Sequence, residues 1–224
     1  NVTTGPGGIN AINGVFGAWT DSIPMLIVSG QVKRETLVSS YGDNGGWRQL
    51  GDQEVDIVNM VNGITKYSIL LTEPKTIKYH LDKAIYLALN GRMGPCWIDI
   101  PIDLQAIQID IDDLKGFNPI EFQHVNLKNL NNEIEELYTL IKKAKRPVFY
   151  VGSGIHSCGL KDDFLKMAEL TGVPVVTAWN SNDLIDDNNI SELYEQRVKF
   201  REKEDNIMVN KLHGIINDKR NDII

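Results

Sequence analysis

The chain has 224 residues, of which 42% are hydrophobic and 24% are charged, and its formal net charge is −7. This composition is typical of a globular protein with a sizeable core, and the length suits one large domain or two smaller ones. The negative charge argues against nucleic acid or an anionic membrane surface as a partner, and no apolar run approaches the roughly 18 residues of a membrane span.

Cysteine and histidine usage gives no sign of a metal site. Cys96 and Cys158 lie far apart in the sequence and show no CxxC or Cys/His spacing. This predicts two reduced cysteines in a cytoplasmic protein. The four histidines also lack ligand spacing and are interpreted as surface or structural residues, with His156 as part of a turn.

Short apolar runs alternate with helix-period segments through the first hundred residues. The expected strands are the strand end Val2–Thr4, then Pro24–Ser29, Ile64–Leu71 and Cys96–Ile100. The expected helices are one whose apolar stripe begins at Ile9, a short one at Val55–Val61, and one that Glu73 and Pro74 open and that reaches Leu89. This alternation predicts a mostly parallel sheet covered by helices.

The rhythm then changes. Residues 103–130 predict a linker, and a second α/β unit begins near Pro147 with a strand, a glycine turn, a helix at Leu160–Leu170 and a strand at 174–179. Residues 188–224 predict amphipathic helices without a further strand. We therefore expect a first domain over 1–110, a linker and helix over 111–144, the start of a second α/β domain over 145–187, and a divergent helical tail over 188–224.

The turn GPGG at 5–8 joins a strand end to a helix. A phosphate-binding turn presents backbone N–H groups, but Pro6 has none, and Asn10 occupies the sixth position of a GxGxxG frame. Two interpretations remain: a tight turn with close helix packing, or a flat wall for an aromatic heterocycle. In the second, Pro6 packs on the ring face while Thr3 and Asn10 supply hydrogen bonds, because Asn10 lies one helical turn past Pro6.

Two more polar positions follow strands or precede a helix. Gln31 ends the second strand, where ligands of open parallel sheets bind, although a polar residue there is most often part of a turn. The segment QLGDQEVDIV at 49–58 enters a helix, so capping explains any one of its carboxylates. Asp52 and Asp56 as a paired acid and base have no third group in support.

Taken in order, TTGPGGINAINGVFGAWTDSIPMLIVSGQV, GDQEVDIV, ITKY and GRMGPCWIDIPIDLQ resemble the thiamine-diphosphate enzymes of the acetolactate synthase type. The stretch corresponds to most of that family's pyrimidine-binding domain, and RPVFYVGSGIHSCG with VPVVTAW resembles the start of its central domain. The resemblance covers residues 1–187. It implies an α/β protein with a parallel-sheet pyrimidine-binding domain, followed by an incomplete Rossmann-like unit.

The resemblance also implies residue roles. In the family, a Thr-Ser/Thr-Gly-Pro-Gly turn and a nearby Asn line the aminopyrimidine ring of the cofactor. The residues expected to bind the cofactor are therefore Thr3, Gly5, Pro6, Gly7, Asn10 and Gln31. Gln53, from the family's Gln-Glu pair, is expected to face the reacting centre as the catalytic residue. Asp52 stands where many relatives have Phe, which implies a more polar acceptor pocket.

Two parts of the family's machinery have no counterpart in these residues. A glutamate on a strand before the turn protonates the pyrimidine ring, and a C-terminal domain with a GDG…N motif binds Mg²⁺ and the diphosphate. GDN at 42–44 is only a superficial echo of that motif. We therefore expect an internal piece of a thiamine-diphosphate-dependent lyase or carboligase that acts on 2-oxo acids, inactive as this chain alone.

The implied partners and the alternatives complete the expectation. The full-length protein is expected to be a homodimer or homotetramer, with Mg²⁺ bound on a domain outside this chain. Some family members hold the ADP part of FAD on the central domain, so the turn at 152–159 makes FAD an alternative cofactor. The competing hypotheses are a non-catalytic dimerising module and a nucleotide-binding α/β protein that uses the same turn.

Overall fold

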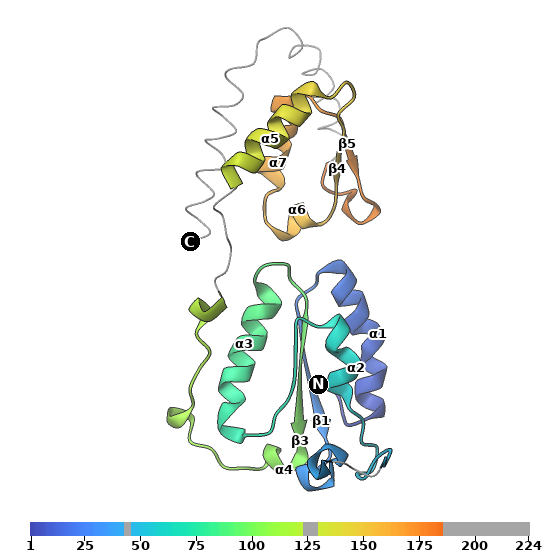
Figure 1. The fold of residues 1–224 in the computed structure, drawn as a ribbon, viewed down its shortest axis with the longest axis vertical. Coiled ribbons are helices and arrows are strands. Elements are labelled where there is room, and N and C mark those ends of the chain that lie inside the picture. The colour runs from blue at the N-terminus through green and yellow to red at the C-terminus, as the bar shows by residue number, and fades with distance from the viewer. Residues whose placement is uncertain (43–45, 123–129, 186–224) are drawn as a thin grey trace. The chain divides into compact units, whose positions relative to one another are not determined.

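The computed structural model describes residues 1–42, 46–122 and 130–185, and the chain divides into two units, 1–124 and 125–224 (Figure 1). The predicted helical tail at 188–224 lies outside the described residues, as do His124 and His213. Within the part of the chain that is described, no helix is both long and apolar enough to cross a membrane.

The first unit is an α/β structure with a parallel sheet. Its strands are β1 (Met25–Gln31), β2 (Tyr67–Leu70) and β3 (Pro95–Pro101), in the spatial order β1-β3-β2. Its α-helices are α1 (Pro6–Asp21), α2 (Ile57–Val61), α3 (Ile77–Leu89) and α4 (Ile102–Gln105). In Figure 1, α1 and α2 lie on one side of the sheet and α3 on the other. The predicted fold class is confirmed.

The predicted strand end before the glycine turn is a single parallel bridge between Val2 and Ser29. The Val2 N–H donates to Val28 O at 3.0 Å, and the Gly30 N–H donates to Val2 O at 3.0 Å. This pairing lies near the carboxyl end of β1. The turn that follows Val2 therefore begins at the edge of the sheet where ligands of parallel α/β proteins bind.

The core lies on both faces of β3, the central strand. Trp97 packs on the α1 and α2 side, whereas Cys96 and Ile98 pack on the α3 side, and all three are fully buried. Burial on both faces explains why the strand reads as an almost continuous apolar run. On α3, Ala84 and Ala88 face this strand, and their small side chains allow the helix to approach closely.

Two helix boundaries differ from the predicted ones for local reasons. The helix α1 begins at Pro6 rather than near Ile9, because a proline at the first helical position has the required φ and loses no hydrogen bond. Its last residue is Asp21, and Ser22 caps it with a left-handed φ of 58° and an N–H that donates to Ala18 O. A 3-10 turn at Pro74–Thr76 leads into α3.

The predicted linker contains regular structure at its start. The strand β3 runs directly into α4, so the first-unit fold continues past the point where strand–helix alternation fades in the sequence. Two 3-10 turns follow, at Ile111–Asp113 and Pro119–Phe122.

The second unit holds one parallel strand pair. Its elements are α5 (Leu130–Lys143), β4 (Phe149–Val151), α6 (Gly154–Ser157), α7 (Lys161–Thr171) and β5 (Val175–Thr177). β4 and β5 pair in parallel, as the predicted strand–helix–strand repeat requires. Phe164 and Ala168 of α7 are buried in one cluster with Leu184. Gly172 ends α7 with a left-handed φ of 60°.

Candidate functional site

The turn that leads into α1 is closed by its own carbonyl groups. The Gly7 N–H donates to Thr4 O at 3.4 Å, and the Gly8 N–H donates to Thr3 O at 3.1 Å. Pro6 has no N–H to offer. The groups that make a helix N-terminus attractive to an anion are therefore absent or already occupied. The turn is unsuited to a phosphate, in agreement with the sequence-based argument.

The outer face of the same turn carries the exposed residues of the predicted ring wall, Thr3, Pro6 and Asn10. Pro6 and Asn10 are both exposed, and positions four apart lie on one face of a helix. Thr3 is exposed as well, and its methyl group covers Gly7, where an added Cβ would lie 2.7 Å from Thr3 Cγ2. An apolar ring beside a hydroxyl and an amide matches the flat face and polar edge of an aminopyrimidine, so these residues fit the expected cofactor half.

Gln53 lies directly against this turn. A Cβ atom added at Gly5 would be 2.3 Å from the Gln53 carbonyl oxygen, so the two backbones touch. Gln53 has a φ of 60°, a left-handed conformation that costs roughly 1–2 kcal/mol for a residue with a side chain. Such outliers cluster at functional sites. The structure thus brings together the predicted ring wall and the predicted catalytic residue, whose side chain is exposed.

The carboxylates of the 49–58 segment divide into different roles. Asp56 caps α2, where its Oδ1 accepts a hydrogen bond from the N–H three positions on, at 3.1 Å. Glu54 is not a cap. Its carboxylate accepts N–H groups from Val38 at 2.7 Å, Leu50 at 2.9 Å and Gly51 at 3.1 Å, so it holds two loop segments together next to Gln53.

Gln31 is buried, and its carboxamide points into the protein. Its Nε2 donates to Val55 O at 2.9 Å and to Asp99 Oδ2 at 2.8 Å, while its Oε1 accepts the Val32 N–H at 2.9 Å. The side chain therefore joins β1 both to β3 and to the segment 51–55. Direct contact between Gln31 and the cofactor stays a prediction. The hydrogen bonds of Gln31 in the structure hold the 51–55 segment, which contains Gln53.

Asp99 is a buried carboxylate that the sequence reasoning missed. It accepts a hydrogen bond from Ser29 Oγ at 2.5 Å, and Ser29 Oγ accepts one from Trp97 Nε1 at 2.7 Å. Burial raises the pKa of Asp99 to about 6, hydrogen bonds from Ser29 and Gln31 oppose this rise, and the charge of Asp56 adds to it. The available signal was an acidic residue in the middle of the apolar strand CWIDI.

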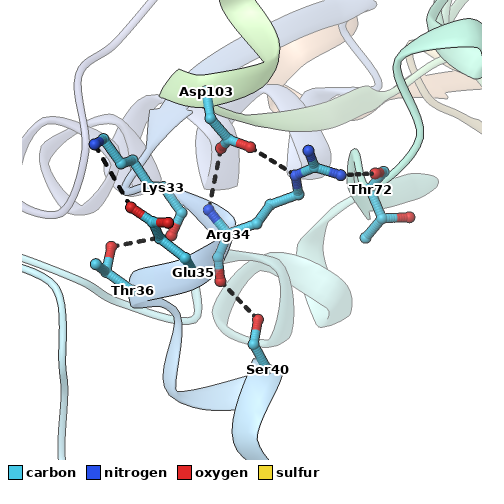
Figure 2. A network of polar contacts seen from close by, with 7 residues as sticks. All are labelled: Lys33, Arg34, Glu35, Thr36, Ser40, Thr72 and Asp103. Carbon is cyan, nitrogen blue, oxygen red and sulfur yellow. Dashed lines mark hydrogen bonds and ion pairs between the residues drawn. The ribbon is translucent and has the colours of Figure 1, made fainter.

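A second polar network ties the strand ends together (Figure 2). Arg34, which follows β1, donates through its backbone N–H to Asp103 Oδ1 at 3.0 Å and through Nε to Asp103 Oδ2 at 2.7 Å. Its NH1 also donates to Thr72 O, just past β2, at 2.9 Å. Partial burial by itself would raise the pKa of Asp103, but the hydrogen bonds and charge of Arg34 outweigh it and lower that pKa. This network fixes the loop that follows Gln31.

The glycine turn of the second unit is open. A Cβ atom added at Gly152 or Gly154 would meet nothing within 4 Å. His156 in this turn places its Nε2 3.4 Å from Asp183 Oδ1, which favours the structural interpretation of this histidine.

The remaining predicted candidates show little chemistry. Among the described residues, no group of three or more His, Cys, Asp or Glu side chains could hold a metal ion. Cys96 and Cys158 are free thiols, and burial raises the pKa of Cys96 to about 11. Asp52 is exposed and Asp56 is a cap, so nothing supports their pairing as acid and base. Asp43 and Asn44 of the GDN echo lie outside the described residues.

Two family models match the chain. Residues 1–64 match the thiamine pyrophosphate enzyme N-terminal TPP binding domain, and residues 134–198 match the thiamine pyrophosphate enzyme central domain. The first match contains Thr3, Pro6, Asn10 and Gln53. The second contains the open glycine turn and continues beyond the described residues.

Three curated proteins with similar sequences are named as acetolactate synthases. An acetolactate synthase large subunit of Corynebacterium glutamicum is 34% identical over 180 residues, which are 78% of this chain and 26% of that protein. An acetolactate synthase large subunit of Lactococcus lactis is 33% identical over 79% of this chain and 29% of its own length. Acetolactate synthase 1, chloroplastic, of Nicotiana tabacum is 33% identical over 78% and 25%. The chain thus spans a quarter to three tenths of these relatives.

Proposed function

Because the chain belongs to the thiamine pyrophosphate enzyme family, we propose that it forms part of a thiamine-diphosphate-dependent carboligase or lyase that acts on 2-oxo acids. The observation that carries the proposal is the backbone contact between Gly5 and Gln53, which sets Gln53 beside the turn that leads to the exposed Pro6 and Asn10. When bound, thiamine diphosphate supplies a carbon nucleophile for the carbonyl group and an electron sink for the bond that breaks.

In this proposal, the residues of this chain bind the aminopyrimidine half of the cofactor and orient the substrate. Pro6 would pack against the face of the aminopyrimidine ring, while Thr3 and Asn10 hydrogen-bond its polar edge, and Gly5 and Gly7 let the turn keep its close contacts. Gln53, held beside the turn, would present its carboxamide to the reacting carbonyl groups and orient them. The exposed Asp52 next to it would make the acceptor site more polar.

The diphosphate and Mg²⁺ belong, in this proposal, to another part of the full-length protein. The first turn of α1 has no free N–H groups for a phosphate, which supports this division. A few neutral hydrogen bonds at roughly 0.5–1.5 kcal/mol each must offset about 4 kcal/mol or more of association entropy. The chain alone would therefore bind thiamine diphosphate at best at millimolar concentration and would not turn over substrate.

The proposed assembly is a homodimer or homotetramer in the cytoplasm. Ile9, Phe16 and Trp19 are exposed apolar side chains on α1, the helix that carries the ring wall, and a second copy would cover them. Sedimentation of Phe16→Glu is expected to show a shift toward monomer. Leu89→Glu, an equally exposed position on α3, is the matched control and is expected to leave the assembly intact.

FAD is a second candidate ligand, and its site would lie within the second unit, at the glycine turn. The open space around Gly152 and Gly154 would admit a close backbone approach by a nucleotide, and this supports the idea. Titration of the full-length protein with FAD and with ADP tests it. Saturable binding of both ligands supports an ADP subsite, whereas no saturation removes FAD from the proposal.

The deciding experiment supplies the full-length protein with pyruvate, thiamine diphosphate and Mg²⁺. We expect release of CO₂ and formation of a 2-hydroxy-3-oxo acid, with the rate falling at least about tenfold in Gln53→Ala. Thiamine diphosphate binding is measured in parallel by calorimetry. If the full-length protein binds the cofactor without turnover, a non-catalytic binding module replaces the enzyme, and absence of both overturns the proposal.

A further inference from the structure

On the basis of the proposed function, we infer that Asp99 is a positioning residue: through the Gln31 carboxamide it fixes the Val55 carbonyl and so the conformation of Gln53. The contacts run without interruption from Asp99 Oδ2 to Gln31 Nε2 at 2.8 Å and from Gln31 Nε2 to Val55 O at 2.9 Å. Val55 lies two residues after Gln53, within the same short segment.

The Gln31 carboxamide has one permitted orientation. Its Oε1 accepts the Val32 N–H, so both N–H groups of Nε2 must find acceptors, and Val55 O and Asp99 Oδ2 are those acceptors. A flipped amide would set its oxygen against the Val55 carbonyl oxygen. Because Gln31 is buried, exchange of these bonds for water is not available. Asp99 therefore acts together with the Val32 N–H and the Val55 carbonyl to keep Nε2, and not Oε1, toward the 51–55 segment.

Gln53 needs such support. A residue in the left-handed region keeps that conformation only where its surroundings over-determine it. Three contacts surround it: Gly5 packs on its carbonyl, Glu54 accepts the Leu50 and Gly51 N–H groups on one side, and the Gln31 bond holds Val55 on the other. Only the last of these reaches back to the central strand.

The chemistry of residue 99 agrees with this role. A carboxylate offers separate oxygens to Ser29 and to Gln31, while Trp97 fixes the Ser29 hydroxyl. Burial and the nearby Asp56 make the ionised carboxylate costly, while the hydrogen bonds from Ser29 and Gln31 offset part of that cost. The network holds the buried side chains next to the 51–55 segment in a single arrangement.

The test compares hydrogen exchange in variants of the full-length protein. Asp99→Ala removes one of the two acceptors of Gln31 Nε2, and Gln31→Met removes the link to Val55 from the other end. Ser29→Ala is the matched control, because Ser29 is equally buried and bonds the same carboxylate but does not contact the 51–55 segment. Asp99→Asn is the conservative variant, since its Oδ1 can still accept from Gln31 while its Nδ2 donates to Ser29 Oγ.

The readout is exchange at the Glu54 and Ile57 amides, which bond to Gly51 O and Val55 O, relative to β3. We expect about tenfold faster exchange at these amides in Asp99→Ala and Gln31→Met, and no local change in Ser29→Ala or Asp99→Asn. Equal local effects in Asp99→Ala and Ser29→Ala, or none in Gln31→Met, would overturn the inference. Exchange needs neither cofactor nor turnover, so an inactive parent protein contradicts the proposed function alone.

Discussion

Gly5 and Gln53 touch through their backbones, and each has a positive φ, 57° at Gly5 and 60° at Gln53. A Cβ at Gly5 would stand 2.3 Å from the Gln53 carbonyl oxygen, well inside van der Waals contact. The turn before α1 and the segment before α2 therefore fit together only if residue 5 has no side chain.

Gly5→Ala is expected to lower the free energy of unfolding by at least about 2 kcal/mol, because it combines a clash with an unfavourable φ. Denaturant titration measures this. Gly14→Ala is the control: it is exposed within α1, has nothing within 4 Å, and is expected to stabilise by about 0.5–1 kcal/mol. A neutral Gly5→Ala would show that the junction adjusts without cost.

At Gln53, glycine should be more stable than alanine. Both substitutions remove the carboxamide, but only glycine adopts a φ of 60° freely, so Gln53→Gly should exceed Gln53→Ala by about 1 kcal/mol in free energy of unfolding. Both variants should lose turnover in the full-length protein. Equal stability of the two would mean that the left-handed conformation is not retained in solution.

Glu54→Gln should loosen the loops around Gln53. A carboxamide has one oxygen and would turn its NH₂ group toward at least one of the three backbone N–H groups, so we expect a loss of about 1–3 kcal/mol. Glu35→Gln is the comparison, because its side chain is exposed and pairs with the exposed Lys33 at 3.6 Å, and it should change stability by less than about 0.5 kcal/mol. Thermal unfolding of both variants decides, and similar losses would contradict the role given to Glu54.

The buried Asp99 predicts a pH effect on stability. Its pKa is raised from 3.8 to about 6 on folding, so the folded protein binds this proton more tightly than the unfolded chain does. The resulting stabilisation is fully present below pH 3.8 and is lost as pH rises through 6. Two pKa units correspond to about 3 kcal/mol.

Asp99→Asn isolates this effect. The variant's free energy of unfolding, relative to the parent protein, should rise by about 2 kcal/mol from pH 4 to pH 7, because all other groups titrate in both proteins and part of the full effect lies below pH 4. Chemical unfolding at pH 4, 5, 6 and 7 gives the difference curve. A flat curve would show that Asp99 keeps an ordinary pKa in the folded state.

Much of the fold followed from periodicity. The bounds of the buried strands and of the amphipathic α3 were predicted within a few residues. Each of these elements buries one face or both faces, and this burial gives its apolar residues a regular spacing. The ends of α1 were not predicted from the apolar pattern, because backbone conformation sets them. Pro6 begins the helix, and the left-handed Ser22 caps it. The helix α4, at the start of the predicted linker, was not predicted, because it has only four residues.

The candidate site was likewise predicted only in part. Pro6, Asn10 and Gln53 were singled out by residue type and motif order, and the structure places Gln53 beside the turn that holds Pro6. Gln31 was also singled out, yet its amide is turned inward to Val55 and Asp99. Nothing local in the sequence marks that direction, because it depends on the parallel register that sets Ser29 opposite Asp99.

The sequence alone thus determined which segments become strands and helices, because burial periodicity and turn chemistry act between residues that are near neighbours in the chain. The order of the motifs identified the family. Only the tertiary structure decided that Gly5 lies on Gln53 and that Gln31 reaches Asp99. Such contacts join residues far apart in sequence, and they form only when the sheet aligns its strands and the helices pack against it.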